Sequence, residues 1–174
     1  MAVLAWTSGL VWFWHYKEKS PYALTLRGHC GYSVAEAKAN DCIYDIMLSS
    51  WVSKPCYNKE LSDKYLAANN FTYYEHSNAL VEIPEEEVRK GEFTRIFTHF
   101  NYHTQHCIYL WNLQILAAKM RRPVLDSISR NQRHIEHCFH LITAVTGPNY
   151  TTWNQPITGT PIHVRPMDLK CWEG

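Results

Sequence analysis

The chain has 174 residues, which is enough for one domain and too few for two full ones. A hydrophobic content of 46% excludes wholesale disorder, and a formal net charge of +1 argues against a basic surface for nucleic acid. The unusual counts are 7 Trp, 11 Tyr, 10 His and 6 Cys. This composition directs attention to metal and disulfide chemistry.

The first 19 residues form an apolar N-terminal segment, and residues 20–174 are expected to form the domain. A bilayer-spanning helix needs about 20 apolar residues, so the uncharged run over residues 2–14 is too short to cross alone. It also lacks the basic stretch and cleavage site of a signal peptide. Two interpretations stay open: the distal end of a truncated membrane anchor, or an apolar segment packed on the domain.

The first half of the domain is predicted to be loop and then helix. Glycines and a proline indicate a loop over residues 20–32. A helix is predicted from the capping residue Ser33 to about residue 52, with an interruption at residues 40–41 before a second apolar stretch. Another short helix is expected over residues 58–68.

The next segments are mixed in character. Short strands are predicted at residues 71–74 and 80–83, and the run from Pro84 to Val88 is typical of the first turn of a helix. Its acidic residues indicate a solvated helix start rather than a metal site.

Two longer helices are predicted over residues 100–120 and 132–145. Apolar periodicity supports the first, and Asn131 is the expected N-cap of the second. A loop is expected over residues 124–130, and the tail from Asn149 is expected to be coil. The predicted fold class is mainly α: a single helical domain with an αα core, long coil segments and disulfides.

Two sequons, at Asn70 and Asn149, accompany the even number of cysteines. Together they favour the secretory-pathway lumen, where glycans and disulfides form. The disulfide connectivity stays open, because six cysteines allow 15 pairings.

The most specific signal is a repeated HxxHC pattern on the two longer helices. The two copies are His103, His106, Cys107 and His134, His137, Cys138. Positions i, i+3 and i+4 share one face of a helix, so each copy presents two imidazoles and one sulfur to the same side. Two identical copies are far less expected by chance than one.

The connection between the helices is long enough to bring the two copies together. The first helix continues about 22 Å beyond His106, and the 12 steps from Arg122 to His134 can span about 40 Å. A tight hairpin would instead leave the copies near opposite ends of the helix pair.

Four converging imidazoles would suit copper that handles dioxygen, with zinc as the alternative metal. Cys107 and Cys138 are candidate ligands or a disulfide that links the helices, and an oxidising lumen favours the disulfide. A closed zinc site or a buried polar network is the interpretation without catalysis. His99 and His140 are candidate donors to the ligand histidines, and Glu136 is the candidate base of a metal-dependent hydrolase.

The paired motifs, about 30 residues apart and preceded by Tyr102, resemble those of the UstYa-like family. This is a fungal family associated with mycotoxin and peptide natural-product biosynthesis. Further shared marks lie at residues 30–37, 42, 44–47, 50–51, 55–57, 60–61, 109–111 and 125–127, and the similarity covers about residues 28–140.

The resemblance implies an N-terminal membrane anchor, a lumenal domain and oxidation chemistry, with copper dependence attributed to some members and halogenation to at least one. It implies that His103, His106, His134 and His137 are the copper ligands and catalytic residues. In this chain the anchor is expected to be truncated or absent. The first motif is followed by Ile-Tyr-Leu-Trp rather than Leu-x-x-Leu-Arg, which leaves the reaction subtype open.

The leading hypothesis is a copper-dependent oxidase that faces the lumen, free or membrane-anchored, and oxidises or cyclises a small-molecule or peptide intermediate with dioxygen. Tyr102, Tyr109 and Trp111 are candidates to line the pocket or relay electrons. The alternative is a non-catalytic metal- or disulfide-stabilised helical partner of an enzyme in the same pathway. Either protein could work as a homo- or hetero-oligomer.

Overall fold

The structure, a computed structural model, describes residues 23–146, 160–164 and 168–174. In this part of the chain 41% of residues are helical and 23% lie in strands, so the protein is mixed α/β. The prediction of a mainly α fold was therefore wrong. The N-terminal segment 1–19 and the sequon at Asn149 lie outside the described residues.

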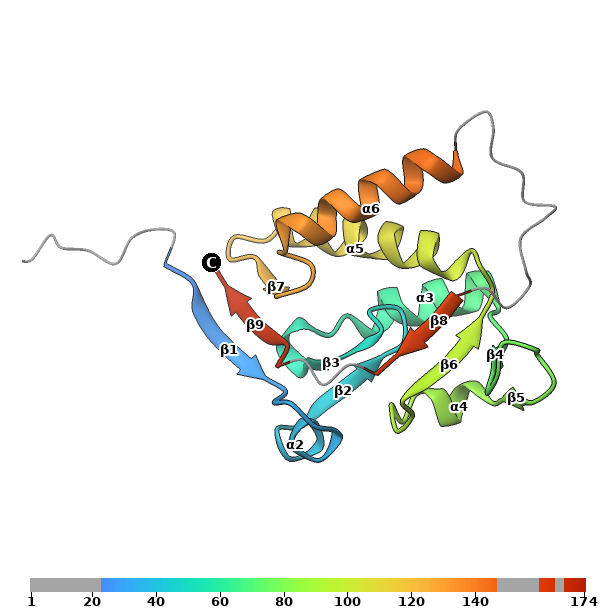
Figure 1. The fold of residues 1–174 in the computed structure, drawn as a ribbon. Helices are drawn as coiled ribbons and strands as arrows, with labels where there is room; N and C mark the ends of the chain where they lie inside the picture. Colours follow the sequence, from blue (N-terminus) through green and yellow to red (C-terminus); the bar gives the residue numbers. More distant parts are fainter. Residues whose placement is uncertain (1–22, 147–159, 165–167) are drawn as a thin grey trace, which may run out of the picture.

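The strands form three small antiparallel sheets (Figure 1). The first sheet has the order β1 (Thr25–His29), β9 (Lys170–Glu173), β7 (Val124–Asp126). The second is a hairpin of β2 (Cys42–Asp45) and β3 (Ser50–Ser53). The third has the order β5 (Glu82–Ile83), β4 (Tyr73–Tyr74), β6 (Arg95–Thr98), β8 (Thr160–His163). Strand β9 thus pairs with two strands that lie far from it in the sequence.

The helices begin close to the predicted positions. They are α2 (Val34–Ala39), α3 (Lys59–Asn69), α4 (Glu85–Val88), α5 (Tyr102–Ala118) and α6 (Gln132–Val145), with a 3-10 turn η1 (Lys54–Cys56). The predicted caps at Ser33 and Asn131 are confirmed, since their side-chain oxygens accept from the amides of Glu36 and His134. Asn58 caps α3 in the same way.

The region after α2 differs most from the prediction. Asp41 has a φ of 58°, which takes the chain out of the helical conformation, and the following residues form the β2–β3 hairpin instead of more helix. In β3 all four residues are buried, so the strand lacks the alternation of apolar and polar residues that would identify it in the sequence. Part of the predicted 124–130 loop is strand β7, and the predicted coil tail contains β8 and β9.

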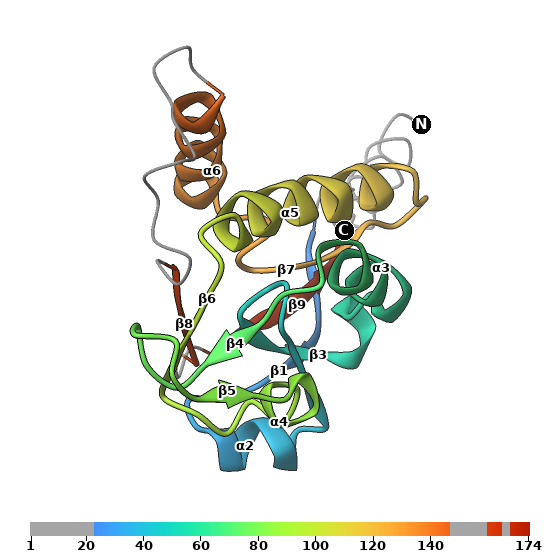
Figure 2. The same ribbon diagram turned by 90° about the vertical axis from the view of Figure 1, so that its right-hand side faces the viewer.

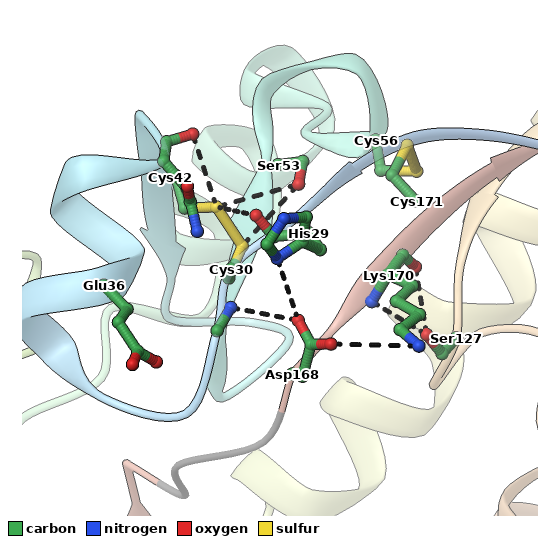
Figure 3. The surroundings of a disulfide bond; sticks show 12 residues. His29, Cys30, Glu36, Cys42, Ser53, Cys56, Ser127, Asp168, Lys170 and Cys171 are labelled. Atoms are coloured by element: carbon green, nitrogen blue, oxygen red, sulfur yellow. Dashed lines mark hydrogen bonds and ion pairs between the residues drawn. A yellow bond between two sulfur atoms is a disulfide. The ribbon is translucent and has the colours of Figure 1, made fainter.

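All six cysteines form disulfides: Cys30–Cys42, Cys56–Cys171 and Cys107–Cys138. Figure 3 shows the first bond beside Ser53, and the second where η1 meets β9. Three disulfides in a chain of this size are typical of an oxidising, secretory-type environment. Among the residues that the structure describes, no helix has the length and apolar character needed to cross a membrane.

The core lies between α5 and the strands. Figures 1 and 2 show α5 lying over the strands, with α6 on its outer side. The largest fully buried side chains include Tyr109 of α5, Tyr73 of β4 and the apolar residues Ile46–Leu48 between β2 and β3. In contrast, α6 buries only Cys138. Helix α5 is therefore anchored in the core, and α6 is attached to it from outside.

Candidate metal centre

Helices α5 and α6 bring the two HxxHC motifs face to face. The Cys107–Cys138 disulfide joins the helices at the motifs, and both cysteines are buried. The favoured disulfide between these two cysteines is therefore present in the structure. The connection between the helices contains β7, which contacts α5.

The four motif histidines form two facing pairs. The Nε2 atoms of His103 and His137 lie 3.1 Å apart, and those of His106 and His134 lie 3.4 Å apart. Along each helix, the two ring centroids are 6.1 Å apart. Each pair thus takes one imidazole from α5 and one from α6, and all four rings share one cluster.

The separation of the paired nitrogens fits a bound ion. Imidazole nitrogens lie about 2.0–2.1 Å from zinc, so two of them on one ion with an angle of 90–109° are about 2.8–3.4 Å apart. The observed Nε2–Nε2 distances of 3.1 and 3.4 Å fall within this range. The donor set is therefore able to hold a metal ion between α5 and α6.

His106 is the buried end of the cluster, and its tautomer follows from its contacts. Its Nδ1 lies 2.7 Å from the backbone carbonyl oxygen of Met47. Because a carbonyl only accepts, Nδ1 carries the proton and the lone pair of Nε2 faces His134. Burial, with smaller contributions from the neighbouring imidazoles, lowers the pKa of His106 to about 4, although the bond to Met47 opposes this. His106 is thus neutral near pH 7, as a metal ligand must be.

The other end of the cluster reaches solvent. His137 is exposed, whereas His103 and His134 are partly buried. Partial burial lowers the pKa of His103, and the neighbouring His137 and His134 lower it further. The cluster therefore has one sealed end and one end that solvent and small molecules can approach.

The motif cysteines form a disulfide that links α5 to α6, and they are not free to act as thiolate ligands. The sulfur of Cys138 lies within 4.8 Å of the ligand atoms of His106 and His134, which is close enough for a shared ion. A disulfide sulfur is not a thiolate, however, and the thiolate is the form that binds metals. The ligand set available in this structure is four imidazoles.

The remaining candidates from the sequence lie elsewhere. The exposed carboxylate of Glu136 accepts from Gln132 one turn earlier on α6, so it is not in the cluster. The ring of His140 packs edge-on against Phe139. His99 is partly buried, and its carbonyl accepts from the amide of Tyr102. Trp111 is partly buried as well.

The sequence did not reveal the turn that holds α5 in place. The hydroxyls of Tyr102 and Tyr109 are buried and bond to the carbonyl of Ile46 and to the carboxylate of Asp45. Burial raises the pKa of Asp45, and the hydrogen bonds that this carboxylate accepts oppose the rise. The role of a backbone carbonyl such as that of Met47 leaves no trace in the sequence.

The fold and the histidine cluster together define a disulfide-linked α/β protein with a candidate four-histidine metal centre. The chain is similar to two proteins of Diaporthe leptostromiformis, phomopsin biosynthesis cluster protein B and protein B'. It is 23% identical to each over 122 residues, which cover 65% of this chain and 36% of the relative's length. No protein-family model and no solved structure matches the chain.

Proposed function

We propose that this protein is a copper-dependent oxidase of fungal secondary metabolism, which oxidises or cyclises a small-molecule or peptide intermediate with dioxygen. The observation that carries the proposal is the cluster of two facing histidine pairs. Their Nε2–Nε2 distances are 3.1 and 3.4 Å, and one end of the cluster is open to solvent. The similarity to two proteins named for a phomopsin biosynthesis cluster supports the pathway class.

The donor set favours copper over other metals. Sites made only of imidazole suit copper and zinc, and copper binds more tightly than zinc to a given nitrogen site. When bound, copper supplies the one-electron and dioxygen chemistry that protein side chains lack. Hydrolysis is less well supported, because the one candidate base, Glu136, is bonded to Gln132 outside the cluster.

The protein's own contribution is to bind and orient. Burial keeps His106 neutral and the Met47 carbonyl fixes its orientation, while the Cys107–Cys138 disulfide holds α6 against α5. His137 is the exposed member of the cluster, so a substrate would approach from its side. Because the fold is closed by three disulfides, the metal is expected to serve chemistry rather than to hold the fold together.

Metal binding is the first test of this proposal. The protein is purified with its disulfides intact, reconstituted with Cu(II) or Zn(II), and measured for bound metal and for the copper electron paramagnetic resonance spectrum. We expect at least about one tightly held copper ion per chain, with nitrogen ligands. His106→Ala is expected to lose it, and His140→Ala, which replaces an exposed histidine of α6 outside the pairs, is expected to keep it. Equal copper binding by the wild type and His106→Ala would refute the proposed site.

A second test separates the oxidase from a non-catalytic partner with a structural metal. The copper-loaded protein is supplied with a reductant, and dioxygen consumption is followed with an oxygen electrode. We expect consumption that depends on copper and on His137, and a small change in melting temperature when the metal is chelated. A protein that melts on chelation and consumes no dioxygen would be the structural alternative.

The proposal places the protein in the secretory-pathway lumen, where its disulfides are stable. The side chain of Asn70 is exposed at the C-terminus of α3, where an oligosaccharide would meet solvent. A shift in mass after treatment with an endoglycosidase, smaller by one glycan in Asn70→Gln, would be the expected mark of that compartment. An Asn70 that carries no glycan in protein secreted from a fungal host would count against this localisation.

A further inference from the structure

Residues 45–47, called the Met47 turn below, form hydrogen bonds with three residues on one face of α5. Tyr102, His106 and Tyr109 stand at positions i, i+4 and i+7, and each bonds to one of residues 45–47, at the end of β2 and directly after it. Their partners are the carbonyl of Ile46, the carbonyl of Met47 and the carboxylate of Asp45, in that order. Contacts of this kind fix both the rotation and the axial position of α5.

Asp45 organises this turn and ties it to its surroundings. Its side chain is buried, with 2% of its surface exposed. One carboxylate oxygen accepts from the amide of Met47 at 3.0 Å and from the hydroxyl of Ser62 at 2.7 Å. The other accepts from the hydroxyl of Tyr109 at 2.6 Å. One carboxylate therefore links the backbone of Met47, helix α3 and helix α5.

We propose that Asp45 is a positioning residue of the metal centre: by holding the Met47 turn against α5, it sets the tautomer and orientation of His106. The inference rests on the proposed function only for the step in which an ion binds. Its structural step concerns the metal-free protein, where Asp45 keeps the Met47 carbonyl in place to accept the Nδ1 proton of His106.

The chemistry of the other tautomer explains why this position matters. If the Met47 carbonyl moves away, the proton of His106 is free to reside on Nε2. That proton would point at the Nε2 of His134, 3.4 Å away, and occupy the position where an ion would bind. Groups that orient a ligand histidine through its second nitrogen typically contribute 10–100-fold to metal affinity. Asp45 acts one bond further out, through the peptide of Met47.

The test measures the tautomer and the copper affinity separately. Long-range proton–nitrogen correlation spectra of the labelled metal-free protein assign the tautomer of His106, and competition with a chelator gives the affinity for Cu(II). In the wild type we expect His106 wholly in the Nδ1–H form. In Asp45→Ala we expect a mixture of tautomers and an affinity that is about 10-fold lower or more.

Two variants make the comparison specific. Asp45→Asn keeps an oxygen that can accept from Met47 and Ser62, so it is expected to retain the Nδ1–H tautomer. Asp126→Ala is the matched control, because Asp126 is a similarly buried carboxylate whose hydrogen bonds come from Ile128 and Ser129 and not from the Met47 turn. It is expected to leave the tautomer of His106 unchanged.

If Asp45→Ala does not fold, Asp45→Ser takes its place in the tautomer and affinity measurements. Its hydroxyl can still accept from the Met47 amide but is too short to reach Tyr109, so it is expected to give a partial loss of the tautomer and of affinity. An Asp45→Ala or Asp45→Ser protein with an intact fold, a wholly Nδ1–H His106 and wild-type copper affinity would overturn the inference, as would an Nε2–H tautomer in the wild type. Absence of copper binding in the wild type would instead refute the proposed function and leave the tautomer result standing.

Discussion

The Cys107–Cys138 disulfide is predicted to be required for the metal centre as well as for stability. The perturbation is the double variant Cys107→Ala/Cys138→Ala, compared with Cys30→Ala/Cys42→Ala. Both pairs are buried disulfides, but only the first joins the two histidine motifs. The comparison therefore separates a general loss of stability from a loss of the site.

The expected loss of stability follows from the sequence separation of each pair. Loop-closure entropy assigns about 4 kcal/mol to the 31-residue separation of Cys107 and Cys138, and about 3 kcal/mol to the 12-residue separation of Cys30 and Cys42. The two variants should thus be destabilised by similar amounts. Their effects on the centre should differ, because Cys138 is the one side chain that α6 buries.

Urea unfolding measures the stabilities, and copper titration of the folded proteins measures the affinities. We expect copper affinity to fall about 10-fold or more in the Cys107/Cys138 variant. In the Cys30/Cys42 variant it should stay within a factor of three of the wild type, about 0.7 kcal/mol. Equal copper affinity in both variants would show that α6 is positioned without the disulfide, and the reasoning would be refuted.

Two further predictions concern single residues of the motifs. The first concerns the free energy of unfolding of the metal-free protein. We expect the advantage of the wild type over His106→Gln to fall as the pH is lowered from 6.5 to about 4. The pKa of His106 is lower in the folded than in the unfolded state, so the unfolded chain binds more protons in this window, and the loss approaches roughly 3 kcal/mol. A pH-independent difference by calorimetry would contradict the lowered pKa. The second prediction is that Glu136→Gln leaves copper affinity and dioxygen consumption unchanged, because this carboxylate is bonded to Gln132 outside the cluster. A large loss of activity with unchanged copper binding would return Glu136 to consideration as a base.

The sequence predicts the helices well because their signals are local. Asn131 caps α6, which spans Gln132–Val145 as expected, and α5 lies within the predicted range of residues 100–120. The i, i+3, i+4 spacing of the motifs places both sets of imidazoles on facing sides. Capping and helical periodicity depend on residues only a few positions apart, so a single sequence contains this information.

Strands β4 and β5 lie within the short strands predicted at residues 71–74 and 80–83, but the other strands and the pairing of all of them were missed, because strand pairing depends on residues far apart in the sequence. Thr25 pairs with Glu173 and Val124 pairs with the same residue, and such pairings leave no mark on neighbouring positions. Strands of two to five residues are also too short to show a period of two. The buried hairpin at residues 42–53 resembled helix for this reason. The same limit applies to the site, where the Met47 carbonyl is a backbone group brought to His106 by tertiary structure.

Strand β9 is the middle strand of its sheet and contains Cys171, the disulfide partner of Cys56. During synthesis, β1 and β7 therefore emerge from the ribosome long before the strand with which both must pair. Until then, Cys56 is a thiol without its native partner and is open to exchange with other cysteines. The folding of this sheet is thus expected to wait until β9 has emerged and to benefit from an enzyme that isomerises disulfides.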